Sequence, residues 1–170
     1  LLVVISIISI LSSIVLASLS TARAKAADAA INSNLISVRT SAALYFSDRD
    51  NYGPPFSLSL GEFPNDCPDS STGGGSMFHF DGPSTASKIN EGINQSKILN
   101  GGTPGYCASS LTSYAVAVEM KIQIPPASPI EYFCIDSTGI SKIVSYSALF
   151  FPILGTATGN PTEPYVFTCR

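Results

Sequence analysis

The chain has 170 residues, a formal net charge of −3 and a charged fraction of only 12%. This length allows one domain with an appendage. The slightly negative net charge argues against a nucleic-acid-binding protein, because a phosphate-binding domain is normally basic. Serine, threonine, glycine and asparagine supply the polarity instead, a composition typical of an exported surface protein.

The first 22 residues, from Leu1 to Ala22, contain no charge, no proline and no glycine. As a helix this apolar half would be about 33 Å long, enough to cross the hydrocarbon of a bilayer. A cleaved signal peptide fits poorly, because its apolar region is shorter and follows a basic start. A membrane anchor for a soluble domain is physically sound, although Arg23 and Lys25 favour a cytosolic location for the residues that follow.

Helical periodicity continues beyond Ala22 and predicts an amphipathic second half. Its apolar stripe, which we expect to pack on a head, consists of Ala27, Ile31, Leu35, Val38, Ala42 and Tyr45. The polar residues that fall largely elsewhere are Arg23, Lys25, Asp28, Asn32, Ser33, Arg39 and Ser41. Gly53 and the two prolines after it stop any helix. The sequence therefore predicts one helix of about 48 residues, roughly 70 Å long.

The remaining sequence changes to patterns of short strands and turns. We expect a loop-rich segment over 56–76, a strand over 76–81, and a helix over 85–99 carrying Ile89, Ile93 and Ile98 at helical spacing. Further strands are expected over 113–124, 130–136, 140–146 and 165–169, with the first two forming a hairpin. The fold class is therefore α+β, a long N-terminal helix packed on a small antiparallel sheet.

Four cysteines lie beyond the predicted long helix, widely spaced and without a CxxC pair. This spacing disfavours a zinc site, which normally needs two close pairs. Four cysteines allow three disulfide connectivities, and the sequence does not choose between them. We favour Cys67–Cys107 and Cys134–Cys169, which would stabilise a head with a small core in an oxidising compartment. The alternative is a cytosolic domain with four buried free thiols.

No catalytic or cofactor motif emerges from the sequence. His79, the single histidine, has no defined partner for acid–base or nucleophilic chemistry. The run of three glycines over 73–75 lacks the lysine and hydroxyl residue of a phosphate loop. Residues 48–53 look like a calcium loop but place Tyr52 at a ligand position, so a helix end is the better interpretation. Asn94 begins a formal glycosylation sequon. We expect no enzyme activity, no cofactor and no metal.

Five segments together resemble a known family. The opening residues LLVVISIISILSSIVLASLSTARAKAADAAINSNL resemble the N-terminal helix of type IV pilins and pseudopilins, in the class whose mature chain starts Phe-Thr-Leu-Ile-Glu and continues Leu-Leu-Val-Val-Ile. Residues 44–46 and 50–53 are similar to that family's helix end. Residues 114–118 and 132–139 are similar to the strands and turn of its head.

The resemblance has two departures. The family's Phe-Thr-Leu-Ile-Glu opening is not in this sequence, so we expect it to precede Leu1 in a longer chain. Processing, N-methylation and the role of the family's glutamate therefore transfer to no residue here. Many relatives also carry a helix-breaking proline in the apolar half, where this chain has Ala17.

The resemblance implies a long helix joined to a globular head, in three parts. They are residues 1–22 as transmembrane segment and filament core, 23–48 as the amphipathic half of the same helix, and 49–170 as the disulfide-bonded head. It implies a non-covalent polymer of identical subunits, a type IV pilus on the cell surface, which serves adhesion, motility or DNA uptake. The filament core would consist of Leu1, Leu2, Val3, Val4, Ile5, Ile7, Ile8, Ile10, Leu11, Ile14, Val15, Leu16 and Leu19.

Further partners follow from the same resemblance. Before assembly the subunit would be anchored in the cytoplasmic membrane and served by the pilus assembly machinery. Afterwards the head loops would contact surfaces or DNA. Two alternatives stay open: a pseudopilin or minor pilin of a type II secretion system or a related one, and a single-copy anchored binding domain outside the cytoplasm.

Overall fold

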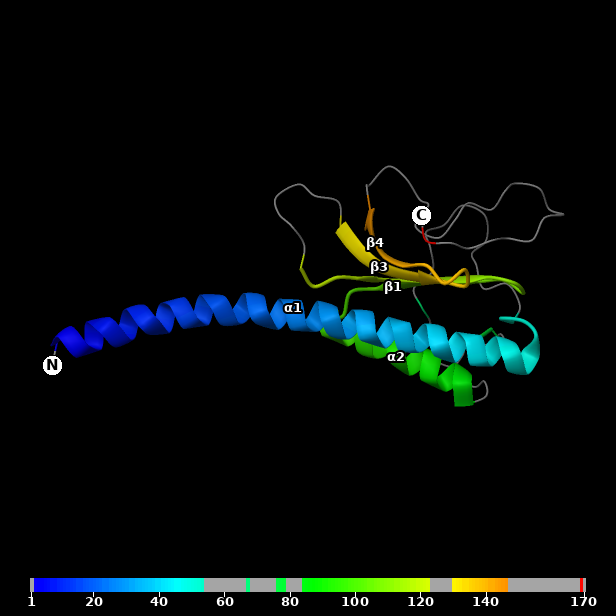
Figure 1. The fold of residues 1–170 in the computed structure, drawn as a ribbon, viewed down its shortest axis with the longest axis horizontal. Coiled ribbons are helices and arrows are strands. Elements are labelled where there is room, and N and C mark those ends of the chain that lie inside the picture. Colours follow the sequence, from blue (N-terminus) through cyan, green and yellow to red (C-terminus); the bar gives the residue numbers. More distant parts are fainter. Residues whose placement is uncertain are drawn as a thin grey trace.

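A computed structural model describes residues 2–53, 67, 76–78, 84–122, 130–146 and 169, with the side chains of residues 2, 17, 84 and 146 left aside. One long helix, α1 (Leu2–Arg49), extends well beyond a head formed by the rest of the described chain (Figure 1). The head contains α2 (Ser84–Asn100), β1 (Gly105–Ser109), β2 (Tyr114–Glu119), β3 (Ile130–Asp136) and β4 (Ser141–Tyr146). The predicted α+β fold class is confirmed.

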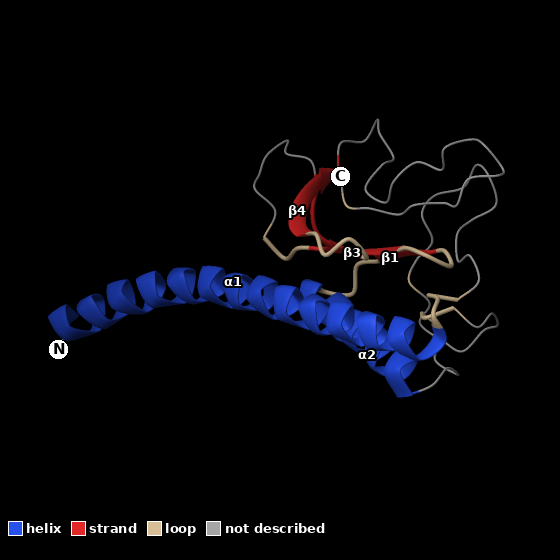
Figure 2. Cartoon of the chain, turned by 45° about the vertical axis from the view of Figure 1, so that its right-hand side comes forward, coloured by secondary structure: helices blue, strands red, loops and turns tan. Residues whose placement is uncertain are grey.

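The four strands form one antiparallel sheet in the order β1-β2-β3-β4. Val116 of β2 lies opposite Cys107 of β1 and Ile135 of β3, which fixes the register at the centre of the sheet. Both helices lie on one face of this sheet, with α1 against β3 and α2 against β2 (Figures 1 and 2). The main core lies between these two layers.

Side chains alternate between the two faces of the sheet, as a pleated strand requires. The helix-facing side chains of the sheet join the main core, and they are Cys107, Tyr114, Val116, Val118, Phe133 and Ile135. The opposite face carries a second cluster made of Tyr106, Ala108, Ala115, Ala117, Tyr132, Cys134, Val144 and Cys169. The sheet is therefore apolar on both faces.

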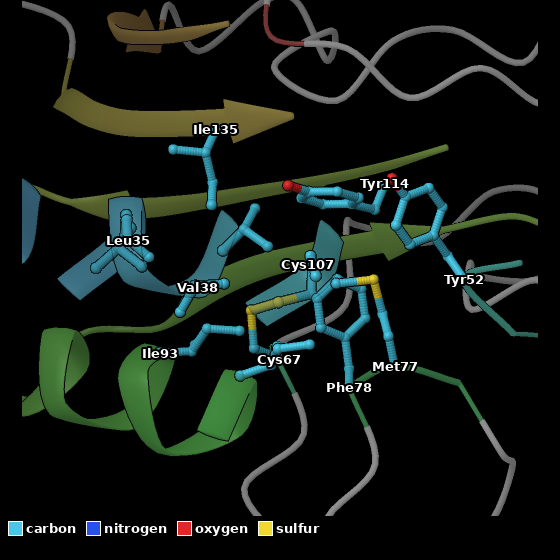
Figure 3. Close-up of a cluster of buried hydrophobic side chains, with 14 of the residues drawn as sticks. Leu35, Val38, Tyr52, Cys67, Met77, Phe78, Ile93, Cys107, Tyr114 and Ile135 are labelled. Atoms are coloured by element: carbon cyan, nitrogen blue, oxygen red, sulfur yellow. A yellow bond between two sulfur atoms is a disulfide. The ribbon is translucent and has the colours of Figure 1, made fainter. Parts of the chain in front are cut away.

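The two helices run antiparallel and approach closely at Gly92 (Figure 1). A Cβ added at Gly92 would come within 2.6 Å of the Val38 Cγ2 atom. Glycine is therefore required here by the contact between helices, and helix propensity alone would disfavour it. Val38 and Ile93 lie near each other in the core between the helices and the sheet (Figure 3).

Each helix ends at a left-handed residue. Asp50, with φ of 57°, follows α1 and its N–H donates to the Phe46 carbonyl at 2.7 Å. Gly101 and Gly102 follow α2 with φ of 109° and 87°. The Gly102 N–H donates to the Lys97 carbonyl at 2.8 Å, the six-to-one bond of a Schellman end.

The structure corrects several expected boundaries. Residues 76–78 form a bend and a turn instead of a strand, while 79–81 and 165–168 lie outside the described residues. The strand expected over 113–124 ends at Glu119, and β1 is a strand that the sequence did not predict. Ile98 is 66% exposed, because it lies nine residues, or two and a half turns, from the buried Ile89.

Candidate functional site: an exposed apolar helix on a disulfide-bonded head

The apolar half of α1 extends away from the described part of the head (Figure 1). Its large aliphatic side chains are exposed, from 42% at Leu19 to 71% at Val3. They are Val3, Val4, Ile5, Ile7, Ile8, Ile10, Leu11, Ile14, Val15, Leu16 and Leu19. The helix is long and apolar enough to cross a membrane, and 0% of its most apolar window is buried inside the structure.

This surface is unfavourable in water. Burial of one large aliphatic side chain contributes about 1.5–3 kcal/mol, so eleven of them would contribute roughly 15–30 kcal/mol if fully covered. Soluble monomers rarely expose contiguous apolar patches above a few hundred Å². The apolar half must therefore be covered by lipid, by other apolar helices, or by lipid at one stage and helices at another.

The serine side chains are compatible with such surroundings. The Ser13 hydroxyl donates to the Ile10 carbonyl at 2.9 Å, so its polarity is satisfied within the helix. A polar group without a partner would be costly in an apolar medium. Serine therefore interrupts the hydrophobic sequence without adding an unpaired polar group at this position.

The second half of α1 belongs to the head. Ile31, Leu35, Val38, Ala42 and Tyr45 of the predicted stripe are fully buried in the main core (Figure 3). The sixth predicted residue, Ala27, is half-buried at the edge of the head. The same helix therefore has one half in the core and one half without cover.

Asp28 corrects the expected distribution of polar residues on α1. It is buried instead of solvent-facing, and its carboxylate accepts the backbone N–H groups of Lys121 at 2.5 Å and Ile122 at 3.2 Å. The Lys121 side chain in turn donates to the Asn100 carbonyl at the end of α2, at 2.9 Å. Asp28 thus ties α1 to the end of β2 close to the point where α1 leaves the head.

A second polar contact binds α1 to the head. Arg39 Nη1 donates to the Gly139 carbonyl at 2.7 Å, which connects the helix to the turn between β3 and β4. The Arg49 guanidinium lies over the ring of Tyr45, one turn earlier on the same helix, 5.3 Å from its centroid. These contacts, with the buried stripe and Asp28, make the apolar half a direct extension of a helix that is held along its second half.

The disulfides are Cys67–Cys107 and Cys134–Cys169, the two pairs favoured from the sequence. Cys67–Cys107 lies in the core on the helix side of the sheet (Figure 3). Cys134–Cys169 lies on the opposite face. All four residues are at most 2% exposed. Disulfides of this kind persist in oxidising compartments, so the head belongs outside the cytoplasm.

A buried carboxylate supports the second disulfide. Asp136 is fully buried, and its Oδ2 atom accepts the Cys169 N–H at 2.8 Å. Its Oδ1 atom accepts the Thr138 hydroxyl at 2.6 Å and the backbone N–H groups of Thr138 and Ile140 at 2.9 and 3.1 Å. Asp136 therefore holds both the turn after β3 and the residue that bears the C-terminal cysteine.

Two tyrosines form the end of the core near the end of α1. The rings of Tyr52 and Tyr114 meet edge to face, with their centroids 4.9 Å apart. Burial raises the pKa of Tyr114 well above the usual range, and the neighbouring Tyr52 and Asp136 raise it further while Arg39 lowers it. Burial also raises the pKa of Tyr52. Both phenols are therefore neutral at physiological pH.

The other sequence candidates do not come together as a site. His79 and the glycines at 73–75 lie outside the described residues. Residues 48–53 form the end of α1, where Asn51 accepts the Gly53 N–H at 2.8 Å. The sequon at Asn94 lies within α2, and its Ser96 is buried. Within the described ranges, no group of three or more histidine, cysteine or carboxylate side chains could hold a metal ion.

Comparison with protein-family models, with curated proteins and with solved structures gives no match. The function is therefore inferred from the exposed apolar half of α1, its junction with the head and the disulfides.

Proposed function

We propose that the chain is a structural subunit that polymerises non-covalently into a type IV pilus filament on the cell surface. The observation that carries this proposal is the continuity of α1. One helix has a bare apolar half and a half that is held in a disulfide-bonded head. The apolar half suits lipid before assembly and a dry bundle of helices afterwards.

A filament explains the shape better than a simple anchor does. An anchor requires only a span and tolerates a flexible link to its domain. Here the link is helical and is tied by Asp28 at the edge of the head, so the orientation of the apolar half relative to the head is fixed. A fixed orientation is what regular packing of identical subunits requires. The role we propose is mechanical and adhesive, without enzyme activity, cofactor or metal.

The proposal is tested by a charge placed in the apolar half. We expect Ile7→Asp together with Ile10→Asp to abolish fibres in the material sheared from cells that express the full-length protein. A charge near the bilayer centre costs at least about 2.5–3.5 kcal/mol on insertion scales, and it would also disrupt a dry filament core. The yield of fibres is counted by electron microscopy, and intact disulfides report a folded head.

The matched control is Ile98→Asp, because Ile98 is an exposed isoleucine on α2, away from α1's apolar half. We expect this variant to keep normal fibres. Unchanged fibres with aspartate at both 7 and 10 would show that the apolar half is not the polymerisation element. Such a result would favour the single-copy anchored domain, whereas short fibres confined to the cell envelope would favour a pseudopilin.

A further inference from the structure

The fold engages half of the charged residues on α1. Six charged residues lie on this helix, and three of them are engaged by the chain itself. Asp28 accepts two backbone N–H groups, Arg39 donates to a turn carbonyl, and Arg49 lies over an aromatic ring. These three charges are accounted for by the fold.

The other three charges lie near the two ends of the second half of α1. Arg23 and Lys25 directly follow the apolar half, and Asp48 is at the last turn of the helix. All three side chains are exposed, and none has an ion pair or side-chain hydrogen bond among the residues that the structure describes. The exposed side of α1 is therefore basic at one end and acidic at the other.

The exposed surface between these ends carries no charge. It consists of Ala26, Ala29, Ser33, Ile36, Ser37, Thr40, Ala43, Leu44 and Ser47. The hydroxyls of Ser37, Thr40 and Ser47 donate to carbonyls of the helix itself, at 3.1, 3.2 and 2.8 Å. Three of the four hydroxyls on this face are therefore satisfied within the helix, so the face can accept a largely apolar surface. We call it the uncharged face.

The uncharged face and the apolar half match in length. A shift of 25 positions along the sequence places residues 1–22 beside residues 26–47, and places Arg23 beside Asp48. At about 1.5 Å per residue this shift is about 37 Å along the helix axis. In this register the apolar half of one copy would cover the uncharged face of another, and Arg23 of the first would lie beside Asp48 of the second.

We propose that the uncharged face of α1 is the docking surface for the apolar half of a second copy, and that Arg23 of that copy pairs with Asp48 to set an axial offset of about 37 Å. This inference rests on the proposed function, since it specifies how two subunits contact each other. Lys25 adds positive charge beside the pair. Charge complementarity favours this register, because a slip by one helical turn moves Arg23 about 5 Å along the axis from Asp48.

The offset is tested by disulfide trapping in filaments of the full-length protein. We expect Arg23→Cys combined with Asp48→Cys to give a ladder of covalent oligomers on non-reducing gels after mild oxidation. The two positions are about 37 Å apart in one chain, whereas a disulfide requires Cα atoms within about 7 Å, so any bond between them joins two copies. Peptide mapping identifies the linked positions.

The matched control is Arg23→Cys combined with Ser37→Cys, which uses another exposed position on α1 but is out of register by 11 residues. We expect no ladder from it. Filaments of the first variant without a ladder, or equal ladders from both variants, would overturn the offset. Absence of fibres from the unmodified protein would instead refute the proposed function, and the offset with it.

Charge reversal gives a second measurement that does not depend on cysteines. We expect Arg23→Asp and Asp48→Arg each to reduce fibre yield at least about tenfold, and the two together to restore it, because the pair is re-formed with its signs exchanged. Loss in both single variants without recovery in the double variant would overturn the pairing. If Arg23→Asp also removes the chain from the membrane fraction, and Asp48→Arg does not restore it, Arg23 serves lipid headgroups instead.

Discussion

At the scale of single residues, Gly92 is the position where the packing of the head is tightest. We expect Gly92→Ala to lower the free energy of unfolding by about 1–2 kcal/mol, because so short a contact calls for the upper part of the overpacking cost of about 1–3 kcal/mol, and the gain in helix propensity offsets about 1 kcal/mol of it. The alanine Cβ would lie 2.6 Å from Val38 Cγ2, and valine has little rotamer freedom in a helix. Thermal unfolding of the full chain in detergent measures the change.

Two comparisons make this prediction specific. Gln95→Ala, at an exposed position of the same helix, is expected to leave the stability within about 0.5 kcal/mol of the original. Val38→Ala should make Gly92→Ala less harmful in the double variant, since it removes the methyl group that clashes. A Gly92→Ala protein as stable as the original would mean that the two helices do not approach as closely as the structure shows.

Because of Tyr114, the stability of the head depends on pH in the alkaline range. Its pKa in the folded state is raised, mainly by burial, above the ordinary tyrosine value of about 10. The unfolded chain therefore ionises at a lower pH than the folded chain. Below about pH 10 both states are protonated, and the stability of the folded state is fully present. As the pH rises toward the folded pKa, ionisation of Tyr114 in the unfolded chain lowers the free energy of unfolding by at most about 1.4 kcal/mol per pH unit.

We expect Tyr114→Phe to reduce the slope of unfolding free energy against pH between pH 10 and 11.5, whatever its effect at neutral pH. Urea unfolding at several pH values in this interval measures that slope. A slope that is the same in the original protein and in Tyr114→Phe would contradict the burial of this phenol.

At the scale of elements, the Cys134–Cys169 disulfide holds Cys169 on the face of the sheet opposite the helices. Its 35-residue separation gives a stabilisation of about 4 kcal/mol in the chain-entropy model. We expect Cys134→Ser with Cys169→Ser to lower the melting temperature markedly, because the buried serine hydroxyls also need new partners. An unchanged melting temperature would show that the C-terminus contributes little to the head.

Most regular elements could be predicted from the sequence, because their signals are local. The absence of proline and glycine before residue 53 predicts α1, and runs of β-forming residues predict β2, β3 and β4. β1 was missed, since three of the five residues GYCAS are small and the segment alternates only weakly. Its strand conformation depends on pairing with β2, which is not a local property.

The errors in the site have a similar origin. Asp28 lies three residues before Ile31 and seven before Leu35, so its spacing places it on the buried stripe. The charge of its side chain predicted a position in solvent instead. Its burial depends on the Lys121 and Ile122 N–H groups, which come from 93 and 94 residues away and have no signal near Asp28. The close approach at Gly92 is likewise visible only once both helices are in place.

At the scale of the whole molecule, the chain combines an oxidised head with a helix that water alone cannot accommodate. We expect non-reducing mass spectrometry of protein isolated from cells to find no free thiol and to map the pairs Cys67–Cys107 and Cys134–Cys169. The two disulfides lie on opposite faces of the sheet, so each holds a different segment. Four alkylatable thiols would remove the argument for a head outside the cytoplasm.

The central claim is that the bare apolar half of α1 is covered by other copies of the same chain. The most direct measurement is electron microscopy of material sheared from the surface of cells that produce the protein, with the fibres identified by mass spectrometry. The account predicts thin fibres composed mainly of this chain, held without covalent bonds between subunits. A chain found only in the membrane fraction, with no fibres that contain it, would contradict the account.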